Sequence, residues 1–301
     1  MKYYFIINPV SGPSNQTKIL TEEITKAFEK KPEHEFEIYV TKASGDAERF
    51  VREKTYDLKE ETAFIACGGD GTSYEVLNGI TDFENSILGV ISVGSCNDFL
   101  KYYPNVDFRT IDKIIGVIPR KIDFISCNDR YALNEVNIGF DAMVNDDCNR
   151  IKAKTKKVKA AYNRAIVKNL LLKKVPYVRV ELDGEKFYED KMFLMTFANG
   201  KFYGGGYQAA PKAIVDDGLI EALIVKNISR IRFATLIKDY KNGTHLDKKK
   251  FEKVICYKRT KKVKLEFLKQ VCICLDGEIT YSSHVELKVE PAKLKFIVPE
   301  V

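Results

Sequence analysis

The chain has 301 residues, of which 45% are hydrophobic and 30% charged. This ordinary globular composition excludes a disordered tail, a collagen-like repeat and a disulfide miniprotein. No window approaches the roughly 18 consecutive apolar residues that a membrane-spanning helix needs. The apolar run before Asn8 is too short for a signal peptide. With seven scattered cysteines and no secretion signal, the sequence predicts reduced thiols in a cytoplasmic protein.

The net charge of +7 is concentrated in one segment. Residues 150–174 contain ten Lys or Arg and no acid, and subtracting these ten from the 49 basic residues leaves 39 against 42 acidic ones. Such a block requires an anionic partner or free access to solvent. The segment also has apolar residues at helical spacing, which predicts an amphipathic helix.

The first 125 residues predict alternating strands and helices. Strands are expected at 3–7, 36–40, 63–67 and 87–93, and helices at 17–30, at 46–54 and after residue 72. Strand–helix alternation with short loops is typical of a mostly parallel sheet with helices on both faces.

The pattern changes near Ile122. Period-two alternation recurs at 177–182, 263–275 and 285–289, and Asp183-Gly184 is a strong hairpin signal. This half therefore predicts antiparallel sheets arranged as a sandwich, interrupted by one long helical pattern over 147–173. A final strand at 293–298 could belong to either domain.

Gly68-Gly69-Asp70-Gly71-Thr72 follows a strand and opens a helix. Glycines allow close backbone approach, and the free N–H groups at a helix start favour a phosphate. An acid within such a turn repels the ligand unless a cation lies between them, so Asp70 indicates Mg²⁺ with a nucleotide. The alternative is a tight turn in which Asp70 caps the helix. No Gly-Lys-Ser/Thr follows, so the loop is not a P-loop.

Two further polar loops follow predicted strands, at 8–12 and 94–98. Each could be a simple turn. In an open α/β sheet, however, loops at the carboxyl ends of the strands converge on the ligand. Three glycine-containing loops at one edge therefore predict a binding site more strongly than any one of them.

These motifs together resemble the diacylglycerol kinase catalytic family, in its soluble bacterial branch. That family is related in fold to sphingosine and ceramide kinases and more distantly to NAD kinases. The resemblance continues through Asn199-Gly200, Gly204 to Gly206, Asp216 to Leu219 and Asp276-Gly277-Glu278. It implies a three-layer α/β ATP-binding domain, residues 1–124 with 292–301, and an antiparallel β-sandwich domain for the lipid substrate, residues 125–291. The active site would lie in the cleft between them.

The resemblance also implies which residues contact ATP. Ser95 stands where the family usually has threonine, Cys96 replaces a common glycine, and Ser73-Tyr74 replaces Leu-Asn. These changes affect the fine shape of the nucleotide pocket rather than the phosphate chemistry. The implied nucleotide contacts are Asn8, Pro9, Val10, Ser11, Gly12, Thr41, Gly68, Gly69, Asp70, Gly71, Thr72, Ser73, Tyr74, Glu75, Ser95 and Asn97.

The family's general base is the glutamate of an Asp-Gly-Glu motif. This chain has two such motifs, ending in Glu185 and Glu278, and each could be a hairpin turn with a solvated glutamate. Glu278 follows the glycine-rich segment, where the family places its base, and is the predicted catalytic residue. Asp70 and Asp98 would organise Mg²⁺ and the phosphates.

Ile214, Asp217 and Leu219 match a second metal site of the bacterial enzymes. There, one carboxylate and two backbone carbonyls hold a Mg²⁺ ion away from the phosphates, and oxygen ligands suit such a hard cation. The alternative is an Asp-Gly turn before a strand.

The resemblance thus implies a lipid kinase that transfers the γ-phosphoryl group of ATP to diacylglycerol, giving phosphatidate. Its basic segment 150–174 would contact an anionic bilayer, making the protein cytoplasmic and peripherally membrane-associated. A solvated surface helix is the alternative. Nucleic acid is not expected, because no aromatic platform accompanies the charge. Another lipid alcohol such as a sphingoid base or phosphatidylglycerol, an NAD kinase and a non-catalytic nucleotide or membrane sensor remain alternatives, and a homodimer is left open.

Overall fold

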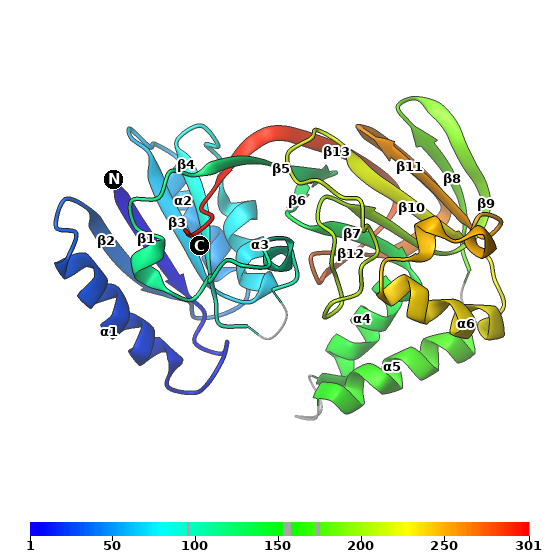
Figure 1. Ribbon diagram of the computed structural model, residues 1–301, viewed down its shortest axis with the longest axis horizontal. Helices are drawn as coiled ribbons and strands as arrows, with labels where there is room; N and C mark the ends of the chain where they lie inside the picture. The colour runs from blue at the N-terminus through cyan, green and yellow to red at the C-terminus, as the bar shows by residue number, and fades with distance from the viewer. Residues whose placement is uncertain (95–96, 153–157, 173–174, 301) are drawn as a thin grey trace. The chain divides into compact units, whose positions relative to one another are not determined.

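The computed structural model describes residues 1–94, 97–152, 158–172 and 175–300. Its contacts divide the chain into two compact units (Figure 1). The first unit is Met1–Phe124 with Pro291–Val301, and the second is Ile125–Glu290.

The first unit is built on a parallel sheet in the order β4-β3-β1-β2. Lys295 and Phe296, near the end of β13, pair in parallel with Ile87 and Leu88 of β4. The elements in chain order are β1 (Lys2–Ile7), α1 (Gln16–Glu29), β2 (Glu35–Val40), α2 (Asp46–Thr55), β3 (Thr62–Gly68), α3 (Asp70–Gly79), β4 (Ser86–Ser92), and the 3₁₀ turns η1 (Phe99–Tyr102) and η2 (Ile111–Lys113).

Helices cover both faces of this sheet, because alternate strand residues point to opposite sides. Leu20 and Ile24 of α1 pack in one core cluster with Phe5 and other residues of the same face. On the other face, the Phe50 ring of α2 lies 5.6 Å from that of Tyr4 between centroids. The predicted three-layer α/β arrangement is confirmed.

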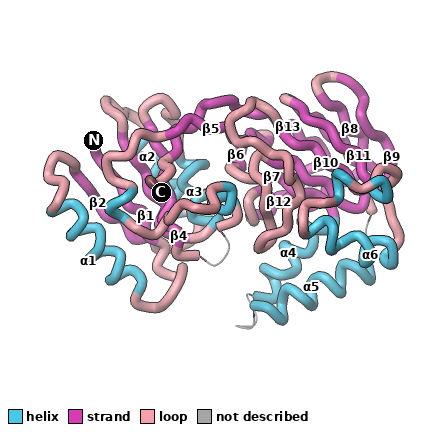
Figure 2. Tube along the Cα trace, in the orientation of Figure 1, coloured by secondary structure: helices cyan, strands magenta, loops and turns pink. Residues whose placement is uncertain are grey.

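The strands of the second unit pair antiparallel with one another, and helices accompany them (Figure 2). Two tight hairpins, at Asp183-Gly184 and Asp276-Gly277, have both turn residues at positive φ, as a type I′ turn requires. The predicted antiparallel β-sandwich class is confirmed. The elements in chain order are β5 (Arg120–Cys127), β6 (Arg130–Ala132), β7 (Glu135–Gly139), α4 (Phe140–Lys152), α5 (Val158–Leu172), β8 (Tyr177–Leu182), β9 (Glu185–Ala198), β10 (Ile220–Lys226), α6 (Arg230–Lys241), η3 (His245–Asp247), η4 (Lys249–Phe251), β11 (Ile255–Thr260), β12 (Lys262–Leu275) and β13 (Glu278–Phe296), the first and last of which continue into the first unit.

The prediction of one long helix over 147–173 is wrong. The structure has two helices, α4 and α5, that lie side by side (Figure 1). Asn169 Nδ2 of α5 donates to Asp147 Oδ2 of α4 at 2.7 Å, and Lys168 Nζ lies 2.6 Å from Asp147 Oδ1. Both helices contribute to one core cluster, through Val144 and Ala165 among others, so reversing the chain buries apolar surface from each.

Among the described residues, no helix combines the length and the hydrophobicity that crossing a bilayer demands.

Candidate active site

Backbone packing brings the loops after β3 and β4 together at the carboxyl edge of the parallel sheet. Gly94 N donates to Gly68 O at 3.1 Å. A Cβ on Gly94 would lie 2.5 Å from Gly69 Cα, and a Cβ on Gly68 would lie 2.2 Å from Thr72 Oγ1. Glycine at position 94 is therefore what allows the two loops to meet, and glycine at position 68 is what allows the Thr72 side chain to pack against its own loop.

The loop after β1 joins the same edge. Asn8 Nδ2 donates to Thr72 Oγ1 at 3.2 Å, and Asn8 Oδ1 accepts from Val10 N at 3.1 Å. Gly12 completes the turn at a φ of 79°. Asn8 therefore fixes its own loop and links it to the start of α3, and the three predicted loops do converge.

Two carboxylates lie close together at this edge. Asp70 accepts from Asn97 N at 3.0 Å and from Asp98 N at 3.1 Å, so it holds the loop after β4 in place. Burial, and then the charge of Asp98, raise the pKa of Asp70 to about 6. Lys101 forms an ion pair with Asp98. Two partly compensated carboxylates at the convergence of three loops have the oxygen chemistry that suits a divalent cation.

The other predicted nucleotide contacts surround this edge. The hydroxyl group of the buried Thr41 donates to Ile7 O at 3.4 Å. Ile7 directly precedes Asn8 in the chain. Ser73 and Tyr74, which depart from the family pattern, are buried in α3. Ser95 and Cys96 lie outside the described residues.

Glu75 has a structural task in this arrangement. Its carboxylate accepts from Gly45 N at 2.8 Å and from Ala47 N at 3.2 Å, at the start of α2. Negative charge at a helix N-terminus is stabilising, so Glu75 caps α2 from the neighbouring helix. The prediction that it also contacts a nucleotide stays a prediction.

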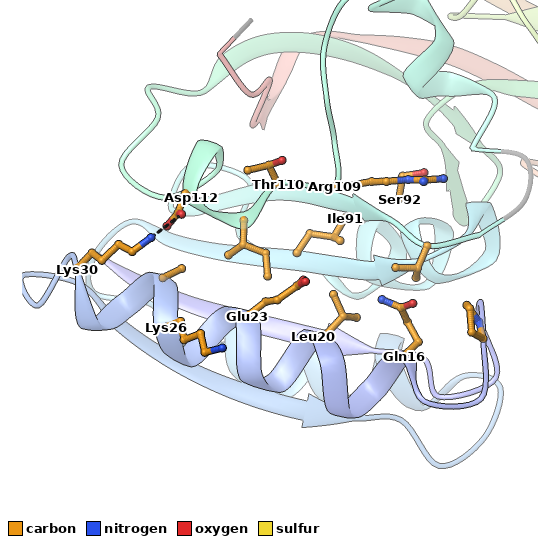
Figure 3. Close-up of a pocket in the computed structure, with 14 residues that line it drawn as sticks. Gln16, Leu20, Glu23, Lys26, Lys30, Ile91, Ser92, Arg109, Thr110 and Asp112 are labelled. Carbon is orange, nitrogen blue, oxygen red and sulfur yellow. Dashed lines mark hydrogen bonds and ion pairs between the residues drawn. The ribbon is translucent and has the colours of Figure 1, made fainter.

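A groove of about 750 Å³ runs along α1 in the first unit (Figure 3). Pro13 of the loop after β1 is among its lining residues, and Arg109, Thr110 and Asp112 lie on the side opposite α1. Charged side chains face it, and Lys30 Nζ donates to Asp112 Oδ2 at 3.0 Å. Because these charged side chains share the lining with apolar ones such as Leu20 and Ile91, the groove is not a purely apolar acceptor pocket.

Glu278 follows the β12–β13 turn and is exposed. The Asp276 carboxylate accepts from three consecutive backbone N–H groups, those of Leu133, Asn134 and Glu135. On the helix side, Asn145 Nδ2 donates to Gly277 O at 2.7 Å. The turn that carries Glu278 is thus held on two sides.

The second Asp-Gly-Glu turn differs. Asp183 accepts from Lys261 N at 3.0 Å and from Lys262 N at 2.9 Å, which resembles the bracing of Asp276. The Glu185 side chain, however, is 83% exposed, and its carboxylate lies 4.0 Å from Lys258 Nζ. This turn has the features of a solvated hairpin, the alternative that the sequence offers for both motifs, and Glu278 is exposed as well.

At the predicted second metal site, the Asp217 carboxylate already has two donors. Leu219 N donates to Asp217 Oδ1 at 3.0 Å, and Arg259 forms an ion pair with Oδ2. The Arg259 guanidinium also contacts Glu221 at 2.8 Å. A cation held by Asp217 and the carbonyls of Ile214 and Leu219 would therefore have to share this carboxylate with Arg259.

Comparisons with known proteins agree with this geometry. Residues 2–127 match the diacylglycerol kinase catalytic domain, and residues 134–298 match the YegS C-terminal NAD kinase beta sandwich-like domain. A diacylglycerol kinase of Bacillus subtilis is 31% identical over 278 residues, covering 91% of this chain and 88% of that relative. The chain belongs to the diacylglycerol kinase family. It is a lipid kinase, and the predicted family, enzyme class and nucleotide binding are confirmed.

Further relatives agree. A diacylglycerol kinase of Staphylococcus carnosus is 30% identical, covering 91% of this chain and 87% of the relative. A probable YegS-like lipid kinase of Chromohalobacter salexigens is 27% identical, covering 97% and 92%. The solved structure of a putative diacylglycerol kinase from Bacillus anthracis aligns with a TM-score of 0.72 at 25% identity, covering 99% and 97%. An NAD kinase from Archaeoglobus fulgidus shares the fold alone, with a TM-score of 0.53 at 13% identity, covering 100% and 94%.

Sequence reasoning missed several side chains that shape the site of this lipid kinase. Asn145 lies in a helix and belongs to no motif, and Lys101 follows the loop after β4 without a signature. The bracing role of Asp276 could have been suspected, because Asp at the first position of such a turn often binds neighbouring backbone N–H groups. No motif near Asn145 could have predicted its contact with Gly277, since the two residues are more than 100 positions apart in the chain.

Proposed function

We propose that this lipid kinase transfers the γ-phosphoryl group of ATP to the hydroxyl group of diacylglycerol, giving phosphatidate and ADP. The observation that supports diacylglycerol as the substrate is the match, over 91% of this chain, to relatives named diacylglycerol kinase. A different lipid alcohol, such as a sphingoid base or phosphatidylglycerol, is the second candidate. The name of the YegS-like relative specifies a lipid kinase without the lipid, which supports that alternative.

In the proposed reaction the acceptor oxygen bonds to the γ-phosphorus while the bond from that phosphorus to the β–γ bridging oxygen breaks. Glu278 accepts the proton of the acceptor hydroxyl, and ADP leaves with the bridging oxygen. The three loops at the edge of the parallel sheet would hold the phosphates, with Asn8 and Thr72 fixing their relative positions.

Asp70 and Asp98 are the residues proposed to hold Mg²⁺. The raised pKa of Asp70 arises from burial and from its like-charged neighbour, and a cation between the two carboxylates would relieve that repulsion. When bound, Mg²⁺ neutralises phosphate charge. Lys101, paired with Asp98, would contribute further positive charge on the same side.

A panel of acceptors tests the substrate. The purified protein is given ATP and Mg²⁺ with mixed micelles of diacylglycerol, sphingosine or phosphatidylglycerol, and separately with NAD. We expect phosphorylated product from diacylglycerol. Product from another lipid alone would retain the enzyme class and replace the substrate. Product from NAD alone, or ATP binding without any product, would contradict the proposal.

Contact with an anionic bilayer is proposed through α5. Val167, Leu171 and Leu172 are 56%, 65% and 55% exposed, next to the exposed Arg164 and Lys168. No acid occurs anywhere in residues 150–174. Exposed apolar side chains beside clustered basic ones suit an interface with acidic lipid, where each basic residue contributes about 1 kcal/mol.

Sedimentation with vesicles tests this contact. We expect the protein to sediment with phosphatidylglycerol-containing vesicles and to remain in solution with phosphatidylcholine alone. Leu171→Glu should weaken the binding. Leu268→Glu is the matched control, because Leu268 is 84% exposed on β12 and does not belong to the basic segment. Equal binding by both variants and the parent would contradict a role for α5, and binding to nucleic acid instead would replace it.

A further inference from the structure

We propose that Asn145 is a positioning residue for Glu278, holding the peptide group from which this glutamate extends. The inference rests on the assignment of Glu278 as the general base. Asn145 lies in α4 and contacts the turn rather than any reacting atom, so its effect would be transmitted through that turn.

The geometry of the turn explains why one hydrogen bond matters. Asn145 Nδ2 donates to Gly277 O at 2.7 Å. This carbonyl and the amide nitrogen of Glu278 belong to one rigid, planar peptide group. Fixing the oxygen therefore fixes the direction in which the Glu278 backbone continues.

The backbone of Gly277 is flexible enough to need the hydrogen bond from Asn145. Its φ is 100°, in the region that glycine enters more readily than other residues, and glycine has the widest choice of alternative conformations. Asp276 is held separately, through its carboxylate and through its own N–H, which donates to Glu135 O at 3.1 Å. Asn145 thus constrains the half of the turn that Asp276 does not.

The helix that carries Asn145 is itself fixed against the same two strands. Ala142 and Met143 of α4 pack with Cys272 and Cys274 of β12 and with Ile279 of β13. Ile279 directly follows Glu278 in the chain. The helix that carries the Asn145 amide therefore packs against the strands on both sides of the turn, β12 before it and β13 after it.

The second Asp-Gly-Glu hairpin serves as an internal comparison. Its aspartate, Asp183, binds backbone N–H groups as Asp276 does. Within the part of the chain that the structure describes, no atom outside the adjacent residues lies within 4 Å of where a Gly184 Cβ would be, whereas Asn145 Nδ2 lies 4.0 Å from the corresponding position at Gly277 and donates to Gly277 O. The helix-side amide therefore distinguishes the turn with the proposed catalytic glutamate from the turn without it.

Two substitutions test the role. Asn145→Ala removes the donor. Asn145→Asp keeps the shape, but its ionised carboxylate can only accept hydrogen bonds and so cannot bind a carbonyl. We expect both variants to lower kcat by about 10- to 100-fold with little change in the KM for ATP, because misplacement of a reacting group by about 1 Å costs about that much. An Asp variant as active as the parent would show that Asn145 only fills space, which would overturn the proposal.

Asn169→Ala is the matched control for stability. The Asn169 amide donates to Asp147 Oδ2 at 2.7 Å, to Ala165 O at 3.0 Å and to Met143 O at 3.3 Å, so these hydrogen bonds join the same pair of helices and do not involve the turn. We expect this variant to melt at a lower temperature while its folded fraction keeps the parent kcat. If the Asn145 variants lose kcat only in proportion to their lost folded fraction, as any destabilised variant would, the positioning role is wrong.

Glu278→Ala separates this proposal from the one on which it depends. An inactive Glu278→Ala protein together with fully active Asn145 variants would overturn the positioning role alone. A fully active Glu278→Ala protein would overturn the assignment of the base. Loss of kcat in both, with ATP binding retained, is the expected result.

Discussion

Replacing Asp276 with alanine should destabilise the second unit, because one carboxylate holds three backbone N–H groups there. It accepts from Leu133, Asn134 and Glu135, with distances of 3.0 and 2.9 Å for the last two. Each intramolecular hydrogen bond contributes about 1 kcal/mol net, and more when the acceptor is charged. We therefore expect Asp276→Ala to lower the free energy of unfolding by about 3 kcal/mol, and Asp276→Asn, which keeps one acceptor oxygen, by about half as much.

The assay is urea denaturation followed by far-ultraviolet circular dichroism, with the slope of the transition compared between variants. Asp183→Ala is the control, since Asp183 occupies the matching place in the other hairpin but binds two N–H groups, both exposed. We expect Asp183→Ala to lower the free energy of unfolding by about 1 kcal/mol. An Asp276→Ala protein within about 0.5 kcal/mol of the parent, the usual range for a surface substitution, would refute the reasoning.

Three further predictions concern other parts of the molecule. Burial raises the pKa of Asp141 to about 6, so the native state holds this proton more tightly than the unfolded state, and stability should fall as pH rises through the interval between the two pKa values. In Asp141→Asn, the free energy of unfolding should decrease by about 1–3 kcal/mol less than in the parent between pH 4 and 7, as urea titrations at each pH would show. Gly94→Ala should lower ATP affinity at least about tenfold in calorimetry, because the new Cβ would lie 2.5 Å from Gly69 Cα and force the loops apart; unchanged affinity would contradict the loop packing. Arg259→Ala should lower the free energy of unfolding by about 2–3 kcal/mol, because Asp217 and Glu221 would lose the guanidinium that they share. Restoration of the lost stability by Mg²⁺ would show that the metal can replace the Arg259 guanidinium.

Local patterns in the sequence were sufficient for much of the fold. Strand and helix periodicities are set by neighbours in the chain, so β1 to β4 and the Asp183-Gly184 hairpin could be predicted from them. The meeting of the loops at 8–12, 68–72 and 94–98 followed from the geometry of parallel sheets.

Features that depend on distant contacts were not predictable in this way. Residues 150–174 contain no Gly or Pro, so nothing in the sequence indicated two helices, α4 and α5, rather than one, although both helices pack on one core. The capping of α2 by Glu75 and the bond from Asn145 to Gly277 join residues 28 or more positions apart. Such contacts emerge only once the chain is folded.

The central claim is that this lipid kinase phosphorylates diacylglycerol with Glu278 as its base. The most direct measurement is transfer of labelled γ-phosphate from ATP to diacylglycerol in mixed micelles by the parent protein, Glu278→Ala and Glu185→Ala. We expect labelled phosphatidate from the parent and from Glu185→Ala, and a loss of activity of about 10²- to 10⁴-fold in Glu278→Ala, the usual contribution of a general base. Full activity of Glu278→Ala, or loss of activity in Glu185→Ala instead, would contradict it.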